Sequence, residues 1–123
     1  MPSFRLTCSL LALVWFVLFA VLCIAPSLYA PTYGIEASEG VQFITHRASP
    51  MFLGFAILLW VLRDEAPSRL RDMVVIAMVA AFIGISLTGL YDFVRGYASQ
   101  TIAIAALIET LMAVVLMRAN AQR

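Results

Sequence analysis

The sequence predicts an all-α integral membrane protein, a four-helix bundle with its N-terminus and C-terminus in the cytoplasm. The first observation is composition: 63% of the 123 residues are hydrophobic, 12% are charged, and the mean hydropathy is +0.99. A soluble domain is about 45–50% apolar and about 25% charged, so this chain has too little polar surface for water. A net charge of +1 provides no cationic stripe for phosphates, and we expect no nucleic-acid partner.

The second observation is four apolar runs of spanning length. A helix needs about 20 mostly apolar residues to cross about 30 Å of hydrocarbon. This criterion predicts spans at about residues 6–25, 40–62, 73–91 and 101–117. The second span holds His46, Arg47 and Pro50 near its start, and Glu109 interrupts the fourth. We therefore expect residues 1–123 to form a single transmembrane domain, with no soluble catalytic domain and no enzymatic activity.

The first span also has features of a secretory signal, because Arg5 precedes the apolar run and Leu28–Ala30 weakly resemble a cleavage site. Its apolar run is longer than the usual core of such signals, and Pro31 would follow the cut. We expect the segment to be retained as a membrane helix.

The third observation is the distribution of arginine, the residue type of all eight basic side chains. With four spans, one side of the membrane receives six of them: Arg5, Arg63, Arg69, Arg71, Arg118 and Arg123. Arg47 and Arg95 lie toward the other side. Cytoplasmic loops are enriched in basic residues, so this imbalance places both termini in the cytoplasm.

The connections between the spans are short. Residues 26–39 are predicted to be a turn-rich interfacial loop, residues 63–72 a charged inner hairpin, and residues 92–100 a short outer loop. Ser38 and Ser68 stand where N-caps of the second and third helices are expected. The short outer loop makes the last two spans antiparallel neighbours.

Small residues predict where the helices pack, because lipid is as apolar as leucine and close packing must hold the bundle together. The third span has Ala80, Gly84 and Thr88 at four-residue spacing. The fourth span has Ala106, Thr110 and Ala113, and the second has Gly54. We expect these positions to mediate contacts within the chain, with homo-oligomerisation as the alternative.

Glu109 is the most informative polar residue. It lies near the middle of its span, where a carboxylate costs about 2.5 kcal/mol or more and is expected to face the bundle interior. At 1.5 Å per residue, Arg47 lies about 22 Å and Glu109 about 14 Å from the inner boundary, so extended side chains can nearly meet. We predict a buried pair between them. The alternatives are a proton or cation site of a small transporter, and a quinone, lipid or partner contact.

A second polar group, His46, Asp92 and Arg95, is predicted at the outer third of the bundle. Metal binding is not expected, because there is one histidine and the cysteines lack ligand spacing. Cys8 and Cys23 are about 22 Å apart along one helix and cannot form a disulfide with each other. Pro50 removes a backbone hydrogen bond, freeing a carbonyl near residue 46 that another group must satisfy. We expect no cofactor.

Residues 25–35 (APSLYAPTYGI) and 47–64 (RASPMFLGFAILLWVLRD) resemble a group of small bacterial four-span proteins of unknown function, close in layout to the DoxX-like and domain-of-unknown-function membrane families. The matching positions are Arg47, Gly54, Trp60, Arg63, Asp64 and Glu109. His46 and Pro50 depart from the group, which has apolar residues there. The resemblance implies a multi-pass protein of the bacterial inner membrane and supplies no activity.

A chain with so little mass outside the bilayer offers partners its lipid-facing surface and short loops. The function expected first is that of a non-enzymatic accessory or scaffold subunit, acting by lateral contact with a larger membrane complex or with copies of itself. The alternative is a proton-coupled small transporter, or a quinone or lipid binder, organised around Glu109 and Arg47.

Overall fold

The computed structural model describes residues 2–122, and in this range it is helical, without strands. The helices are α1 (Phe4–Ile24), α2 (Pro26–Thr32), α3 (Glu39–Leu62), α4 (Arg69–Val94) and α5 (Gln100–Ala121). All except α2 are long and apolar enough to cross a membrane, and each of the four predicted spans overlaps one of them. The all-helical class and the four long helices are confirmed.

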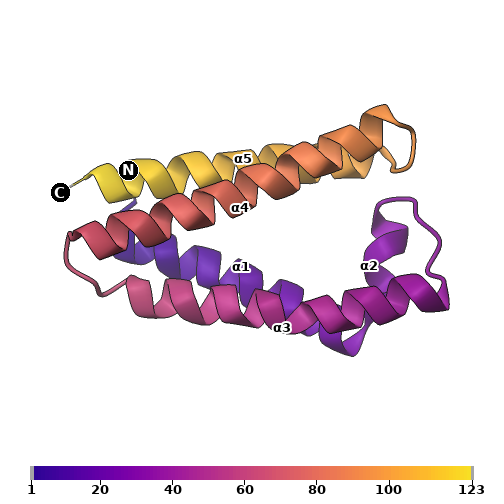
Figure 1. Cartoon of the computed structure of the whole chain (residues 1–123), viewed down its shortest axis with the longest axis horizontal. Coiled ribbons are helices and arrows are strands. Elements are labelled where there is room, and N and C mark those ends of the chain that lie inside the picture. Colours follow the sequence, from indigo (N-terminus) through magenta and orange to yellow (C-terminus); the bar gives the residue numbers. More distant parts are fainter. Residues whose placement is uncertain (1, 123) are drawn as a thin grey trace.

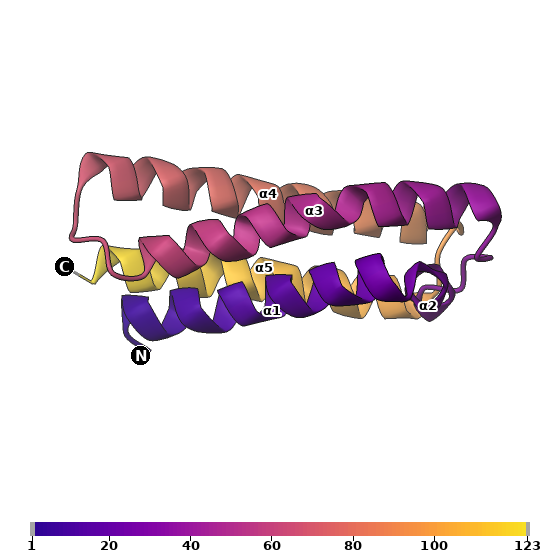
Figure 2. The same ribbon diagram turned by 90° about the horizontal axis from the view of Figure 1, so that it is seen from below.

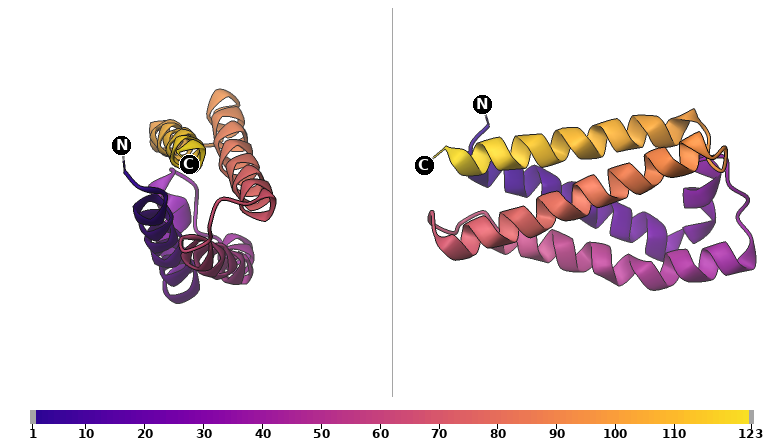
Figure 3. Two further views of the ribbon diagram at one scale, coloured as in Figure 1. Left: turned by 90° about the vertical axis from the view of Figure 1, so that its left-hand side faces the viewer. Right: turned by 45° about the horizontal axis from the view of Figure 1, so that its top comes forward.

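The four long helices run up and down in a bundle (Figure 1). Both chain ends and the α3–α4 turn lie at one end, called here the termini end (Figures 1 and 2). Helix α2 and the α4–α5 turn lie at the other, the α2 end. Viewed along its axis, the bundle has the order α1, α3, α4, α5, which places α3 and α5 on a diagonal (Figure 3). Helix α1 packs chiefly on α3, and α4 chiefly on α5.

Three of the long helices have a serine N-cap whose side chain accepts a backbone hydrogen bond. The Oγ atoms of Ser38 and Ser68 accept hydrogen bonds from the backbone N–H groups of Val41 and Arg71 at 3.3 and 3.1 Å. Each bond satisfies an N–H that the first helical turn leaves without a partner. The two predicted N-caps are confirmed, and Ser3 caps α1 in the same way.

Helix α2 corrects the prediction of a turn-rich loop over residues 26–39. Pro26 opens it at a position where a proline needs no N–H and already has a helical φ angle. Gly34, with φ of +76°, ends it, and the Ile35 N–H donates to the Ala30 carbonyl at 3.2 Å in a Schellman motif. The Ser99 N–H then donates to the Tyr33 carbonyl at 2.8 Å, which ties α2 to the start of α5.

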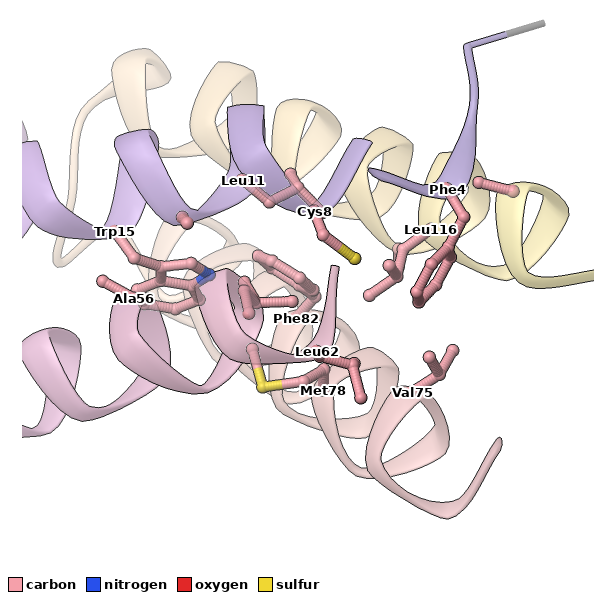
Figure 4. Close-up of a cluster of buried hydrophobic side chains, with 14 residues drawn as sticks. Phe4, Cys8, Leu11, Trp15, Ala56, Leu62, Val75, Met78, Phe82 and Leu116 are labelled. Atoms are coloured by element: carbon pink, nitrogen blue, oxygen red, sulfur yellow. The ribbon is translucent and has the colours of Figure 1, made fainter. Parts of the chain in front are cut away.

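The hydrophobic core lies toward the termini end, and Trp15 of α1 lies at its edge nearest the middle of the bundle (Figure 4). Trp15 is 3% exposed. Its ring centroid lies 5.1 Å from that of Phe52 and 5.2 Å from those of Phe55 and Phe82. The indole thus joins α1, α3 and α4, in tilted ring contacts typical of buried aromatic clusters.

Helix α3 continues through Pro50. The Oγ atom of Ser49 donates a hydrogen bond of 2.8 Å to the carbonyl of His46, the residue four positions before the proline. The carbonyl that Pro50 frees therefore has a partner in the adjacent side chain, as a proline inside a membrane helix requires.

Helices α4 and α5 are joined by small and hydroxyl side chains. The Ser86 Oγ donates to the Ala106 carbonyl at 2.8 Å and lies 2.9 Å from the Thr110 Oγ1. Ala106 and Ala113 are buried. Ala106 and Thr110 thus contact Ser86 of α4, and Ala113 belongs to the hydrophobic core.

The predicted contacts of Ala80, Gly84 and Thr88 with other helices of the same chain are not formed, and homo-oligomerisation through them stays a prediction. Ala80, Gly84 and Thr88 are exposed, and so is Gly54 of α3. A Cβ atom added at Gly84 or Gly54 would meet no atom within 4 Å. The buried face of α4 carries instead Arg71, Val75, Met78, Phe82, Ser86 and Gly89. Both faces of α4 combine small and large apolar residues, so spacing alone did not distinguish the inner from the outer one.

We expect Ser86→Ala to lower the free energy of unfolding by about 1 kcal/mol, because hydrogen bonds between membrane helices contribute about 0.6 kcal/mol on average and up to about 1.7. Thr88→Ala is the matched control, since within residues 2–122 the Thr88 hydroxyl bonds only the Ile85 carbonyl of its own helix. Titration with a denaturing detergent measures both. Equal losses would contradict the interhelical role of Ser86.

Candidate functional site

The structure does not bring Arg47 and Glu109 together. Arg47 is exposed, and its guanidinium carbon lies 5.8 Å from the ring centroid of Phe43, one turn earlier on α3. Helices α3 and α5 lie diagonally across the bundle (Figure 3), so they are not packing neighbours that could bring the two side chains together. The predicted buried pair is wrong: within residues 2–122 no ion pair joins Arg47 to Glu109, because depth along a helix does not determine which residues face each other.

Glu109 lies instead in a groove between α1 and α5, called here the Glu109 groove, with a volume of about 420 Å³. Its lining is apolar except for the glutamate and a tyrosine: Leu13, Val14, Val17, Leu18, Tyr33, Ala105, Ile108, Glu109 and Met112. The Glu109 side chain is half-buried. Within residues 2–122 its carboxylate makes no hydrogen bond or ion pair.

Two tyrosines from the α2 segment lie beside the α2 end of this groove. Tyr33 lines it, and the Tyr29 and Tyr33 rings meet edge to face with centroids 5.2 Å apart. Burial raises the pKa of Tyr29 above its ordinary value, and the neighbouring charges of Tyr33 and Glu109 act in the same direction. The four-residue spacing of Tyr29 and Tyr33 could have suggested that they share one face of a helix. Their position beside Glu109 depends on the fold of the α2 segment.

The geometry defines what this groove can hold. Glu109 is the tenth of the 22 residues of α5, so it lies near the middle of the helix. A carboxylate at that depth costs about 2.5 kcal/mol or more unless a positive charge or a hydrogen-bond donor satisfies it. The surrounding walls are apolar. The groove therefore suits an apolar body that carries one donor or cationic group.

The predicted outer cluster is not assembled. The Arg95 Nη2 donates to the Tyr97 hydroxyl at 3.2 Å, and the guanidinium lies 5.6 Å from that ring centroid. The Asp92 carbonyl accepts from the Tyr97 N–H at 2.9 Å, which ends α4. His46 is exposed on α3. Among the described residues, no hydrogen bond or ion pair joins the side chains of His46, Asp92 and Arg95 to one another.

Arg71 is a buried polar residue that sequence reasoning did not single out. It is 4% exposed, and its guanidinium lies 3.8 Å from the Phe4 ring centroid. Its nitrogens donate to the Asn120 Oδ1 at 2.7 Å, the Glu65 carbonyl at 3.1 Å and the Asn120 carbonyl at 3.3 Å. Asn120 in turn donates to Asp72 at 2.8 Å. This network joins α1, α4 and α5 at the termini end and has a structural role.

The spacing of residues on α4 could have indicated that Arg71 is buried. It lies four residues before Val75 and seven before Met78, on the buried face of the helix.

In the described part of the chain, no three His, Cys, Asp or Glu side chains gather where a metal could bind. Cys8 and Cys23 are free thiols.

Comparisons of the chain with protein-family models, curated proteins and solved structures give no match. The similarity to the DoxX-like families therefore stays a prediction.

Proposed function

We propose that this chain is a multi-pass protein of the bacterial inner membrane, with both termini in the cytoplasm, that acts as a non-enzymatic accessory subunit by lateral contact with a larger membrane complex. Four long apolar helices support the insertion. The orientation is supported by the arginines of the termini end: Arg5, Arg63, Arg69, Arg71 and Arg118. Arg123 belongs to the same predicted set and lies outside the described residues.

The observation that carries the proposal is the half-buried Glu109 carboxylate, without an ion-pair partner in residues 2–122, in a groove open at the side of the bundle. A groove between two helices accepts a third helix lengthwise, and polar side chains bond across such contacts. A partner helix with a Ser, Thr, Asn, Lys or Arg side chain at this depth would satisfy the carboxylate. This bond would fix both the depth of the partner helix in the membrane and its rotation about its own axis.

Purification from native membranes in mild detergent tests this proposal. We expect a stoichiometric partner with the wild-type chain and at least a tenfold loss of that partner with Glu109→Gln. The melting temperature of the variant is expected to stay unchanged, because no partner within residues 2–122 is removed. Glu36→Gln, at an exposed acid of the α2–α3 connection, is the control and retains the partner. A wild-type chain recovered alone, or a partner retained by Glu109→Gln, would contradict the proposal.

A second candidate is a proton-coupled small transporter, or a quinone or lipid binder, at the same groove. The observation that favours it is the proximity of Tyr29 and Tyr33 to Glu109, since several polar groups are needed along a proton path. Arg47 has no part in this version. In proteoliposomes loaded with a pH-sensitive dye, it predicts flux that Glu109→Gln abolishes while the protein stays folded.

A further inference from the structure

A second groove, called here the α1–α3 groove, lies between α1 and α3 and has a volume of about 340 Å³. Ala12 and Ala56 form its floor and are 3% and 5% exposed. Because both residues are small, the helices leave space above them. Phe16 and Trp60 are among its walls, and all of its lining residues are apolar.

Charge is concentrated beyond the termini end of this groove. The Arg63 guanidinium carbon lies 3.3 Å from the centroid of the Trp60 ring, a lining residue. The Asp64 carboxylate pairs with the Arg63 Nε at 3.1 Å and with the Arg5 Nε at 3.0 Å. Two guanidiniums share one carboxylate, so the group has a formal charge of +1. Within residues 2–122 their terminal nitrogens make no further hydrogen bond.

The charged group formed by Arg5, Arg63 and Asp64 lies along the same helix faces as the floor of the groove. Arg5 precedes Ala12 by seven residues on α1, and Arg63 follows Ala56 by seven residues on α3. Seven residues are about two helical turns, or about 10 Å, so each arginine lies close to the helix face of its alanine, displaced toward the termini end. The positively charged group thus lies about 10 Å along the helix axes from the floor of the apolar groove, so one phospholipid can place its phosphate at the first and an acyl chain in the second.

We propose that the α1–α3 groove binds an acyl chain of an anionic phospholipid whose phosphate is held by Arg5 and Arg63. Charge complementarity selects this occupant: basic pockets between membrane helices on the cytoplasmic side bind anionic headgroups, and guanidinium matches phosphate in geometry. Trp60 contributes an aromatic wall beside the headgroup region, where such rings concentrate. The proposal rests on the proposed membrane insertion and does not depend on Glu109.

The test measures lipid binding to the delipidated, detergent-purified full chain by native mass spectrometry. The probes are dioleoyl phosphatidylglycerol, dioleoyl phosphatidylcholine and glycerol 3-phosphate. We expect the first to bind at least tenfold more tightly than the second, and the third, which lacks acyl chains, not to bind. The double variant Arg5→Gln/Arg63→Gln is expected to lose this preference, whereas Arg69→Gln, at another exposed arginine of the same end, keeps it.

Substitutions that fill the groove with larger side chains test separately whether it holds an acyl chain. Ala56→Leu is expected to weaken phosphatidylglycerol binding at least tenfold; Ile57→Trp, at a lining residue that is 56% exposed, does the same without disturbing the floor. Glu109→Gln keeps full lipid binding, so failure of the accessory-subunit proposal leaves this result unaffected. Equal binding of the two phospholipids, tight binding of glycerol 3-phosphate, or unchanged binding by Ile57→Trp would overturn the inference.

Discussion

Replacing Arg71 with glutamine is expected to lower the free energy of unfolding by about 3 kcal/mol, near the upper end for single substitutions. The side chain is 4% exposed and donates three hydrogen bonds that join the start of α4 to the end of α5 and to the α3–α4 turn. Glutamine is too short to reproduce them. The Glu65 carbonyl and the Asn120 oxygens would lose donors in a partly buried site, and a buried polar group without a partner is costly.

Arg69→Gln is the matched control for this prediction, since Arg69 begins the same helix and is exposed. We expect its effect to stay within about 0.5 kcal/mol, as for most surface substitutions. Both variants are measured by equilibrium unfolding in mixed micelles of mild and denaturing detergent. Similar losses for the two arginines would show that the network of Arg71 does not stabilise the bundle.

Trp15→Ala is expected to cost about 3 kcal/mol, in the lower part of the range for removing a large buried aromatic side chain. In a bilayer the loss reflects packing rather than water exclusion, because the cavity removes ring contacts that lipid cannot replace. Phe52, Phe55 and Phe82 would each lose a neighbour about 5 Å away. The same detergent titration measures the loss.

Two companion variants show whether packing is the cause. Trp15→Phe is expected to cost about 1 kcal/mol, as a smaller cavity, because the buried Nε1 has no hydrogen-bond partner within the described residues. Phe43→Ala, at an aromatic residue that is 61% exposed, is expected to cost less than about 0.5 kcal/mol. A phenylalanine variant as unstable as the alanine variant would point to a polar role for the indole instead.

The features that the sequence predicted well are local ones. A span depends on the length of one apolar run, and the caps at Ser38 and Ser68 depend on a serine immediately before such a run. The carbonyl freed by Pro50 is likewise satisfied by its neighbour Ser49. None of these features requires knowledge of which helices are adjacent.

The features that were missed depend on helix order and rotation. Arg47 and Glu109 were paired by height alone, and the diagonal placement of α3 and α5 separates them. The stripe Ala80–Gly84–Thr88 has packing spacing, yet the opposite face of α4 is the buried one. Helix α2 was too short for a hydropathy criterion, although it brings Tyr29 and Tyr33 to Glu109.

Of the candidate site, Glu109 itself could be predicted, because a carboxylate in the middle of an apolar run is conspicuous. Its surroundings could not. The groove is built by residues of α1 and α5 that are separated by about 90 positions, and their facing sides follow only from the assembled bundle. The apolar residues that line it were indistinguishable in sequence from those that face lipid.

Photo-crosslinking in native membranes tests most directly the claim that a partner completes the Glu109 groove. A benzophenone amino acid replaces Ile108, which lines the groove, or Leu107, which is 71% exposed and is not among the lining residues. We expect one discrete protein adduct from position 108, lost when Glu109 is changed to glutamine, and lipid adducts from position 107. The same adducts from both positions, or no protein adduct from position 108, would contradict that claim.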